Sequence, residues 1–270
     1  MLSFQKRHLW TLAAICIVAL VSGVSSAQDA ADDAPSGAEI MDRYIEASGG
    51  KENYEKIENR YAAGTVTIPG MGLELTLEMY TAKPNLQYTL VESEATGTVQ
   101  RGTNGEIYWE KSVMGGPRIL EGEEAAQAMR DAFFDKHAQW RDHYSSAEYV
   151  GTDSAAGEQC WVVELTPNEG KVEKLYVSKE SNLPVKSVTT MEHQMGEINV
   201  EVFMSDYREV DGLKIPFTNS VEIMNQGRSM VFDTLAHNVD MPDSLFEIPD
   251  DIKALMEEKP ANADTTGDSN

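Results

Sequence analysis

The chain has 270 residues, a formal net charge of −23 at pH 7 and a hydrophobic fraction of 41%. This length allows one large domain or two small ones, with enough apolar residues for a sizeable core. A chain this negative is repelled by nucleic acid and by anionic lipid surfaces, so a nucleic-acid-binding function is not expected.

Residues 1–27 have the features of a secretory signal peptide. Lys6 and Arg7 precede the apolar run "LWTLAAICIVALV", which is short for a bilayer span, and "SSA" offers small residues for cleavage after Ala27. We therefore expect an exported chain in the periplasm of a diderm bacterium, with no stable membrane span after cleavage. A retained membrane anchor is the alternative. Export would leave Cys160 without a cysteine partner in the chain, so no internal disulfide is expected.

The chain between its two polar ends is predicted to be one domain, over residues 37–250. Residues 28–36 are predicted to form an acidic linker, and residues 251–270 are predicted to form a disordered acidic tail. Both stretches are rich in small and acidic residues and contain no aromatic residue. Within residues 37–250, no stretch has the composition of a linker.

Helical signals occur at the start and in the middle of this domain. Ser36 and Glu39 have the spacing of a capping box at the start of a first helix, and Gly49-Gly50 is a typical stop. A short second helix is predicted over "KENYEKI". Residues 121–144 are predicted to hold one or two helices, because apolar residues recur there at helical spacing: Ala125, Met129, Ala132 and Phe133.

The rest of the domain alternates apolar and polar residues, with turns every 10–14 residues. In "GLELTLEMY" the leucines and the methionine share one face and the polar residues the other, which is typical of a strand. We predict an α+β fold that is mainly β: a strongly curved antiparallel half-barrel of eleven or twelve strands. Its exposed apolar face needs cover, and the N-terminal and central helices are expected to cover the concave side.

Sequence motifs for catalysis or metal binding are not found. There is no GxSxG, HExxH, P-loop or CxxC, and no two histidines have ligand spacing on one element. We therefore expect no enzyme activity, no catalytic residue, no metal and no cofactor. A hydrolase of envelope material is the enzyme hypothesis that this argument disfavours.

The candidate functional residues are instead apolar. Thirteen methionines suit a surface that adapts to varied apolar partners. The alternating strand faces and the central helix supply the candidate lining of an apolar cavity: Leu73, Leu75, Leu77, Met79, Tyr88, Trp109, Met129, Phe133, Val200, Val202 and Met204. The alternative is that these residues are ordinary core beneath the helices.

Several stretches together resemble a known family. These are "EIMDRYIEASGGKENYEKIENRYAAGTVTIPGMG", "WVVELTP", "MGEINVEVFMSDYREVDGLKIPF" and "FDTLAHNVDMPDSLFEIP". They resemble exported outer-membrane lipoprotein-sorting-like proteins, which are similar to the periplasmic lipoprotein carrier. The "DYREVDGLKIPF" stretch is predicted to be a hairpin that turns at Asp211-Gly212.

The resemblance implies a half-barrel whose open side is plugged by helices, with an apolar cavity that binds acyl chains. We therefore expect a non-catalytic exported protein that binds a lipid or the acyl chain of a lipoprotein, in envelope lipid or lipoprotein trafficking. The alternative is a structural or protein-interaction module of the cell envelope without a ligand, whose partners would be envelope proteins.

Overall fold

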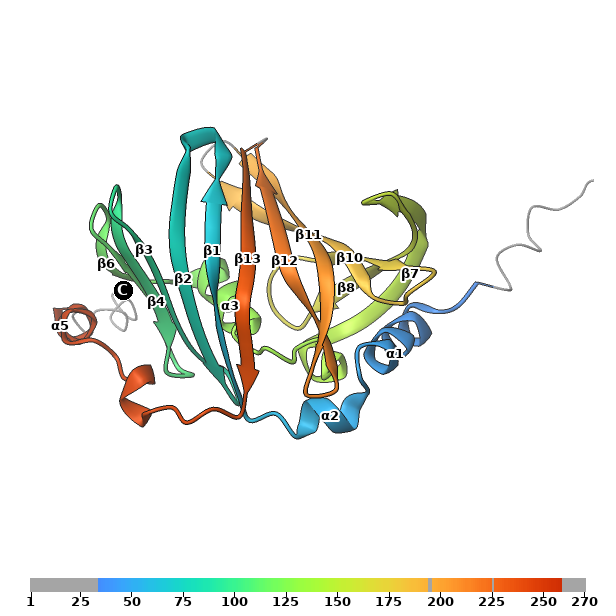
Figure 1. Cartoon of the computed structure of the whole chain (residues 1–270), viewed down its shortest axis with the longest axis horizontal. Helices are drawn as coiled ribbons and strands as arrows, with labels where there is room; N and C mark the ends of the chain where they lie inside the picture. Colours follow the sequence, from blue (N-terminus) through green and yellow to red (C-terminus); the bar gives the residue numbers. More distant parts are fainter. Residues whose placement is uncertain (1–33, 194–195, 225, 259–270) are drawn as a thin grey trace, which may run out of the picture. The chain divides into compact units, whose positions relative to one another are not determined.

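A computed structural model describes residues 34–193, 196–224 and 226–258 (Figure 1). The predicted signal peptide, residues 1–27, lies outside the described residues, and so does the predicted linker up to residue 33. The fold below concerns the unit that begins at Pro35.

The described residues form thirteen β-strands and a few short helices. The strands are β1 (Asn59–Ile68), β2 (Leu73–Ala82), β3 (Leu86–Ser93), β4 (Gly97–Thr103), β5 (Tyr108–Ser112), β6 (Gly116–Ile119), β7 (Tyr144–Ala155), β8 (Glu158–Pro167), β9 (Glu173–Ser178), β10 (Pro184–His193), β11 (Gly196–Val210), β12 (Leu213–Ile223) and β13 (Gln226–His237). The α-helices are α1 (Gly37–Ala47), α2 (Lys51–Glu55), α3 (Gly122–Asp131), α4 (Trp140–His143) and α5 (Asp250–Glu258), and the 3-10 helices are η1 (Pro69–Met71) and η2 (Asp243–Phe246).

All thirteen strands belong to one antiparallel sheet, in the order β6-β5-β4-β3-β2-β1-β13-β12-β11-β10-β9-β8-β7. Two consecutive series of hairpins meet where the first strand pairs with the last, with Arg60 opposite His237. Strands β6 and β7 are the two edges, so the sheet is open and is not closed into a barrel. The predicted antiparallel, mainly β fold is confirmed.

The sequence predicted eleven or twelve strands, and β6 is the strand that it missed. This strand has four residues and contains Pro117. It is too short to show an alternating pattern, and proline within a strand is found mostly at edges, strand starts and bulges. The predicted central helical region is also divided, since α3 ends at Asp131 and α4 begins at Trp140.

The sheet is strongly bent toward the side that carries α3, which lies behind the central strands in Figure 1. Arg101 on β4 and Val200 on β11 are six interstrand spacings apart, or about 29 Å in a flat sheet. Both nevertheless line one cavity together with Ala128 of α3. The sheet therefore curves until its two arms face each other, as the predicted half-barrel requires.

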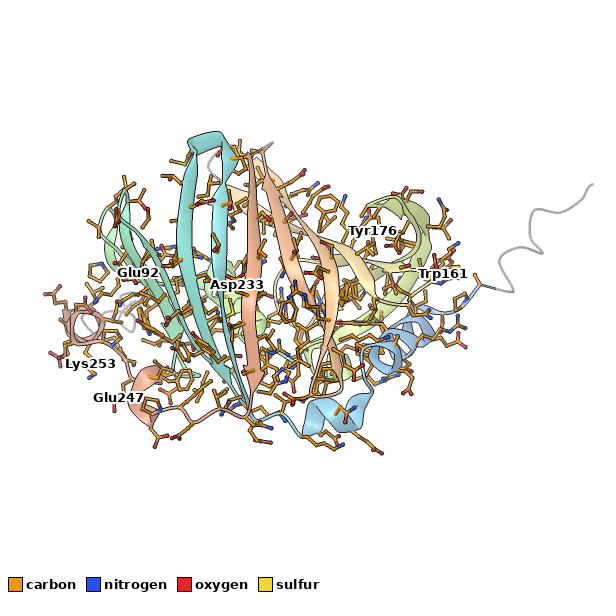
Figure 2. The ribbon with its side chains drawn as sticks, in the orientation of Figure 1. Glu92, Trp161, Tyr176, Asp233, Glu247 and Lys253 are labelled. Carbon is orange, nitrogen blue, oxygen red and sulfur yellow. The ribbon has the colours of Figure 1, made fainter. Side chains whose placement is uncertain are left out.

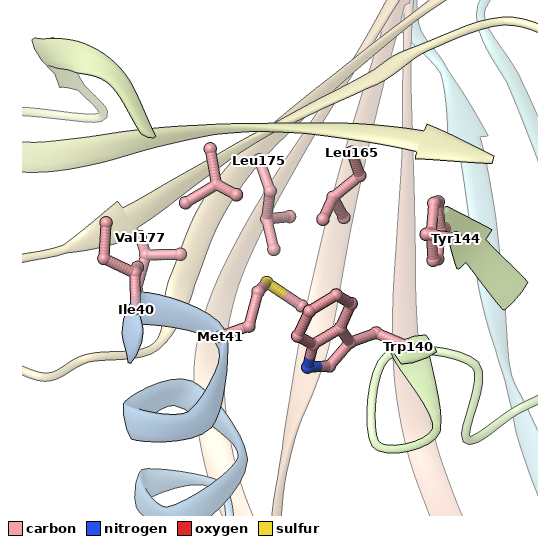
Figure 3. Close-up of a cluster of buried hydrophobic side chains, with 8 residues drawn as sticks. Ile40, Met41, Trp140, Tyr144, Leu165, Leu175 and Val177 are labelled. Carbon is pink, nitrogen blue, oxygen red and sulfur yellow. The ribbon is translucent and has the colours of Figure 1, made fainter. Parts of the chain in front are cut away.

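Helices α1 and α4 pack on the same concave face, over β8 and β9. Figure 3 shows Met41 and Trp140 pointing toward the leucines of these strands. The buried cluster consists of Ile40, Met41, Trp140, Tyr144, Val163, Leu165, Leu175 and Val177. Each large side chain removed from water in such a cluster contributes about 1.5–3 kcal/mol to folding. This cluster fixes one wall of the half-barrel.

Both predicted landmarks at the start of the domain and at the long hairpin are present. The Ser36 amide donates to Oε2 of Glu39 over 2.8 Å, and the Glu39 amide donates to the Ser36 hydroxyl over 3.2 Å, so the capping box is confirmed. Asp211 and Gly212 connect β11 to β12 with φ of 51° and 79°, which confirms the predicted hairpin turn.

The C-terminal segment differs from the sequence prediction. Residues 251–258 belong to α5, so the prediction of a disordered tail from residue 251 is wrong for them. Ile252 is fully buried, and the Asp251 carboxylate lies 2.8 Å from the Lys111 ammonium. The polar composition concealed a helix that has one buried apolar anchor. Residues 259–270 lie outside the described part of the chain.

Candidate functional site

A cavity of about 780 Å³ lies in the concavity of the sheet, beside α3. One wall comes from β3–β6 and the other from β10–β13. Its lining residues are Gln87, Arg101, Tyr108, Glu110, Arg118, Leu120, Glu123, Glu124, Gln127, Ala128, Asp131, Lys171, Thr190, Val200, Ile223 and Arg228. The lining of the cavity therefore contains both apolar and charged groups, whereas the sequence predicted an apolar lining.

The charges on the β4–β6 wall hold one another in place. The Arg101 guanidinium lies 2.7 Å from the Glu110 carboxylate. Arg118 forms two hydrogen bonds with Glu124 of α3, at 2.8 and 3.0 Å. The hydrogen bonds from Arg118 lower the pKa of the Glu124 carboxyl, and the same contact raises the pKa of Arg118. These pairs tie α3 to the short edge strand and so fix the position of the helix over the cavity.

Most of the predicted lining residues do lie on the concave face. Leu77 and Met79 pack with Ala62, Phe217 and Phe232 on the floor of the sheet. Alternation along β2 and β11 places the remaining strand residues on the same face: Leu73, Leu75, Val200, Val202 and Met204. Of the whole predicted set, Val200 alone is among the residues that line the 780 Å³ cavity.

The two predicted residues of the central helical region serve to attach it. The Thr103 hydroxyl donates to the Met129 sulfur at 3.2 Å, and the ring centroids of Phe133 and His143 are 4.4 Å apart. The structure therefore places both in the packing of this region beneath the sheet. The predicted residues on the concave face of the sheet, together with Met129 and Phe133, fit the alternative prediction that the set is ordinary core beneath the helices.

Tyr88 and Trp109 lie on the opposite, convex face, so the prediction that they share a cavity wall with Leu77 is wrong. Tyr88 pairs with Tyr80, which alternates with Met79 and points away from the concavity. The sequence shows aromatic residues within strands, but the face on which each one lies depends on the register of neighbouring strands.

An aromatic row crosses this convex face from β1 to β5. Ring centroids are 4.8 Å apart for Tyr61–Tyr80, 6.3 Å for Tyr80–Tyr88 and 6.3 Å for Tyr88–Trp109. The C-terminal segment lies beside the end of the row, where Glu247 and Lys253 (Figure 2) line a 480 Å³ pocket with Tyr88 and Trp109. The aromatic row and the C-terminal segment thus lie on the convex face, whereas α1, α3 and α4 lie on the concave side.

A buried polar network lies under the central helical region and was missed by sequence reasoning. Oε2 of Glu173 on β9 accepts a 2.6 Å hydrogen bond from Tyr144, and the same atom lies 3.4 Å from the Lys136 ammonium. Nε2 of His137 lies 3.4 Å from Oε1 of Glu173. Burial opposes ionisation of Glu173, but Lys136 and His137 outweigh it and hold the pKa of this carboxyl well below its usual range.

This network attaches the 131–144 region to the sheet and offers no access to a substrate, since the Glu173 side chain is only 4% exposed. Among the described residues, no group of three or more His, Cys, Asp and Glu side chains could hold a metal ion. Of the helices that the structure describes, none is long and apolar enough to cross a membrane.

Comparisons with solved structures agree on the fold. A protein of the DUF1329 family from Desulfovibrio piger is 15% identical, with 78% of this chain and 96% of that chain covered and a TM-score of 0.54. A LolA superfamily protein from Nitrosomonas europaea is 14% identical, with 80% and 99% covered and a TM-score of 0.54. The chain has the fold of the LolA superfamily. The fold implied by the resemblance in the sequence is therefore confirmed.

A third solved structure supports the same fold. An outer membrane lipoprotein-sorting protein domain from Vibrio parahaemolyticus is 10% identical, with 77% of this chain and 94% of that chain covered and a TM-score of 0.53. A family model described only as an uncharacterized protein matches residues 124–249. No curated protein sequence matched the chain. At these identities the LolA-like half-barrel is shared, and the ligand has to be inferred from the residues of this chain.

Proposed function

We propose that this chain is an exported, non-catalytic protein that binds the acyl chain of a lipid or lipoprotein in the cavity between the bent sheet and α3. The observation that carries the proposal is the 780 Å³ cavity in the concavity of a LolA-like half-barrel. This volume lies within the usual range of pockets for small ligands. A solved relative in fold is described as lipoprotein-sorting, which supports an acyl chain as the ligand.

The concave face has the apolar surface that such a ligand needs. On the same concave face lie Met79, Val91 and Met230, which are only partly buried and pack around the core of Leu77 and Phe232. Methionine side chains are flexible and polarisable, so they adapt to a chain that has no fixed shape. An acyl chain that lies on these residues would shield their apolar surface from water. This burial favours binding by about 25 cal/mol for each Å².

The proposal includes export to the periplasm with removal of residues 1–27, and one ligand-binding domain that begins near residue 37. It also includes the absence of catalysis. The most strongly perturbed carboxylate, Glu173, is occupied by Tyr144, Lys136 and His137 and is closed to substrates. The names of the lipoprotein-sorting and LolA relatives in fold do not describe enzymes, which agrees with a carrier.

Native mass spectrometry of the exported protein, expressed from the full-length sequence and purified gently from the periplasm of an expression host, tests the proposal. We expect a co-purified lipid, and we expect binding of a fluorescent fatty acid to the delipidated protein. The variant Ala128→Trp places a large ring in the cavity and should weaken this binding at least about tenfold, since it competes for the same volume. Ala254→Trp, on the exposed side of α5, is the matched control.

Failure to detect either a lipid or probe binding would contradict the carrier proposal. That result would favour the second candidate, a structural or protein-interaction module of the envelope without a ligand. Probe binding that Ala128→Trp leaves unchanged would place the acyl site elsewhere and would contradict the proposed cavity.

A further inference from the structure

Each carboxylate that lines the cavity already has a cationic partner. Glu110 pairs with Arg101 at 2.7 Å, and Glu124 pairs with Arg118 at 2.8 Å. The other two pairs are Glu123 with Lys171 at 4.0 Å and Asp131 with Lys136 at 2.7 Å. Each of these acids thus has a cation within 4.0 Å, and Lys136 and Lys171 are shared with Glu173 and Glu197.

Arg228 on β13 is a further cation in this lining. Among the residues that the structure describes, none forms a hydrogen bond or ion pair with it. The Arg228 side chain is exposed at the mouth of the cavity, and partial desolvation first, with the nearby positive charge of Arg101 second, lowers the pKa of its guanidinium. Four interstrand spacings separate the two arginines, or about 19 Å in a flat sheet, so the bend of the sheet is what brings them toward each other. Arg101 is already paired with Glu110, so an anion beside Arg228 would supply the counter-charge that this second guanidinium lacks.

An apolar path leads from Arg228 to the floor of the sheet. Met230 and Phe232 follow at alternate positions of β13, about 7 Å apart along the strand, and point to the same face. Phe232 is buried, and Met230 packs against the same cluster. Val200 and Ile223 line the cavity on the neighbouring strands. One positive charge at the end of an apolar strip matches an amphiphile that has one negative charge at the end of its chain.

We propose that Arg228, facing Arg101 across the cavity, binds the anionic head group, a carboxylate or phosphate, of the amphiphile whose chain lies on the concave face. This inference rests on the proposed function, since it specifies the class of acyl ligand. A guanidinium offers a planar fork of donors that fits a carboxylate or phosphate in two hydrogen bonds. The strongly acidic chain would repel such an anion elsewhere, so a local cation gives selectivity for the orientation of the ligand.

Isothermal titration calorimetry with two matched probes tests this assignment. Laurate carries a carboxylate, and dodecanamide has the same chain with an uncharged head group. We expect the delipidated full-length protein to bind laurate about tenfold more tightly than dodecanamide. Arg228→Gln should remove this preference and leave dodecanamide binding unchanged, while Arg228→Lys should retain part of it, because a lysine keeps the charge but not the planar fork.

Arg141→Gln is the control, since Arg141 pairs with Asp42 on the surface, away from the cavity lining. Equal affinity for the two probes, or an unchanged preference in Arg228→Gln, would overturn the inference and leave the carrier proposal standing. Failure of both probes to bind would overturn both. Inorganic phosphate that binds alone as tightly as laurate, and depends on Arg228, would instead identify a site for a free anion.

Discussion

The hydroxyl of Tyr144 donates a 2.6 Å hydrogen bond to Oε2 of Glu173, and both side chains are almost completely buried. Tyr144 begins the edge strand β7, and Glu173 begins β9, two strands away. Lys136 reaches the same carboxylate from the segment between α3 and α4. One buried charge thus connects both the edge of the sheet and the central helical region, and a change at either partner should be measurable.

Replacement of Tyr144 by phenylalanine should lower the free energy of unfolding by about 2 kcal/mol, because it leaves a buried carboxylate short of one donor. Urea denaturation followed by tryptophan fluorescence gives this value. Tyr149→Phe on the same strand is the matched control, since its ring packs edge-on against Trp161 and its hydroxyl has no hydrogen bond among the described residues. Equal effects of the two substitutions would show that the Glu173 contact does not stabilise the fold.

The depressed pKa of Glu173 predicts a specific loss of stability in acid. An unfolded glutamate has a pKa of about 4.3, and the folded pKa lies well below this value. The stabilisation is therefore complete above the unfolded pKa and is lost as the pH falls through the folded pKa. Unfolding free energies measured between pH 7 and pH 3 should fall more steeply for the wild type than for Glu173→Gln.

The same variant gives a check at neutral pH. Glu173→Gln should be destabilised by about 3 kcal/mol at pH 7, because Lys136 and His137 lose a buried negative partner. The difference between the two proteins should then shrink toward low pH. A difference that stays constant across this range would mean that Glu173 does not titrate with folding.

The end of α1 lies against the turn between β11 and β12, and Gly49 makes this contact possible. Its φ is +129°, and a Cβ on it would lie within 2.2 Å of the Gly212 carbonyl oxygen. Gly49→Ala should therefore cost about 3 kcal/mol in unfolding free energy, from backbone strain and from displacement of the turn. Gly70→Ala, where a Cβ would meet no atom within 4 Å, should change it by less than about 0.5 kcal/mol. Similar thermal denaturation midpoints for both variants would contradict this account.

Local signals in the sequence predicted the two ends of α1 and the turn between β11 and β12. The Ser36–Glu39 capping box, the Gly49-Gly50 stop and the Asp211-Gly212 turn each depend on a few neighbouring residues, and all three are present. Alternation along β2 likewise placed its leucines on one face. Such signals predicted the element types and the antiparallel sheet, because each is decided within one strand, helix or turn.

Contacts between distant segments were not predicted. Tyr88 and Trp109 were assigned to the wrong face, since the face depends on the register of strands that pair through separate hairpins. Arg101 and Arg228 are 127 positions apart in the sequence and meet across one cavity only because the sheet bends. The sequence shows Arg228 in a predicted strand. It does not show that the acidic residues near Arg228 in the fold are paired with other cations. The charged part of the candidate site therefore required the structure.

Helix α5 gives a direct test of the corrected C-terminus. Ile252→Ala should release this helix, because the side chain is fully buried and its removal costs about 2 kcal/mol or more. Hydrogen exchange should then accelerate at residues 250–258, while the amides of α1 stay protected. Met256→Ala, at a side chain that is 44% exposed, should leave the exchange of α5 unchanged. Exchange of 250–258 at the rate of an unstructured peptide in the wild type would contradict the helix and restore the prediction of a tail that starts at residue 251.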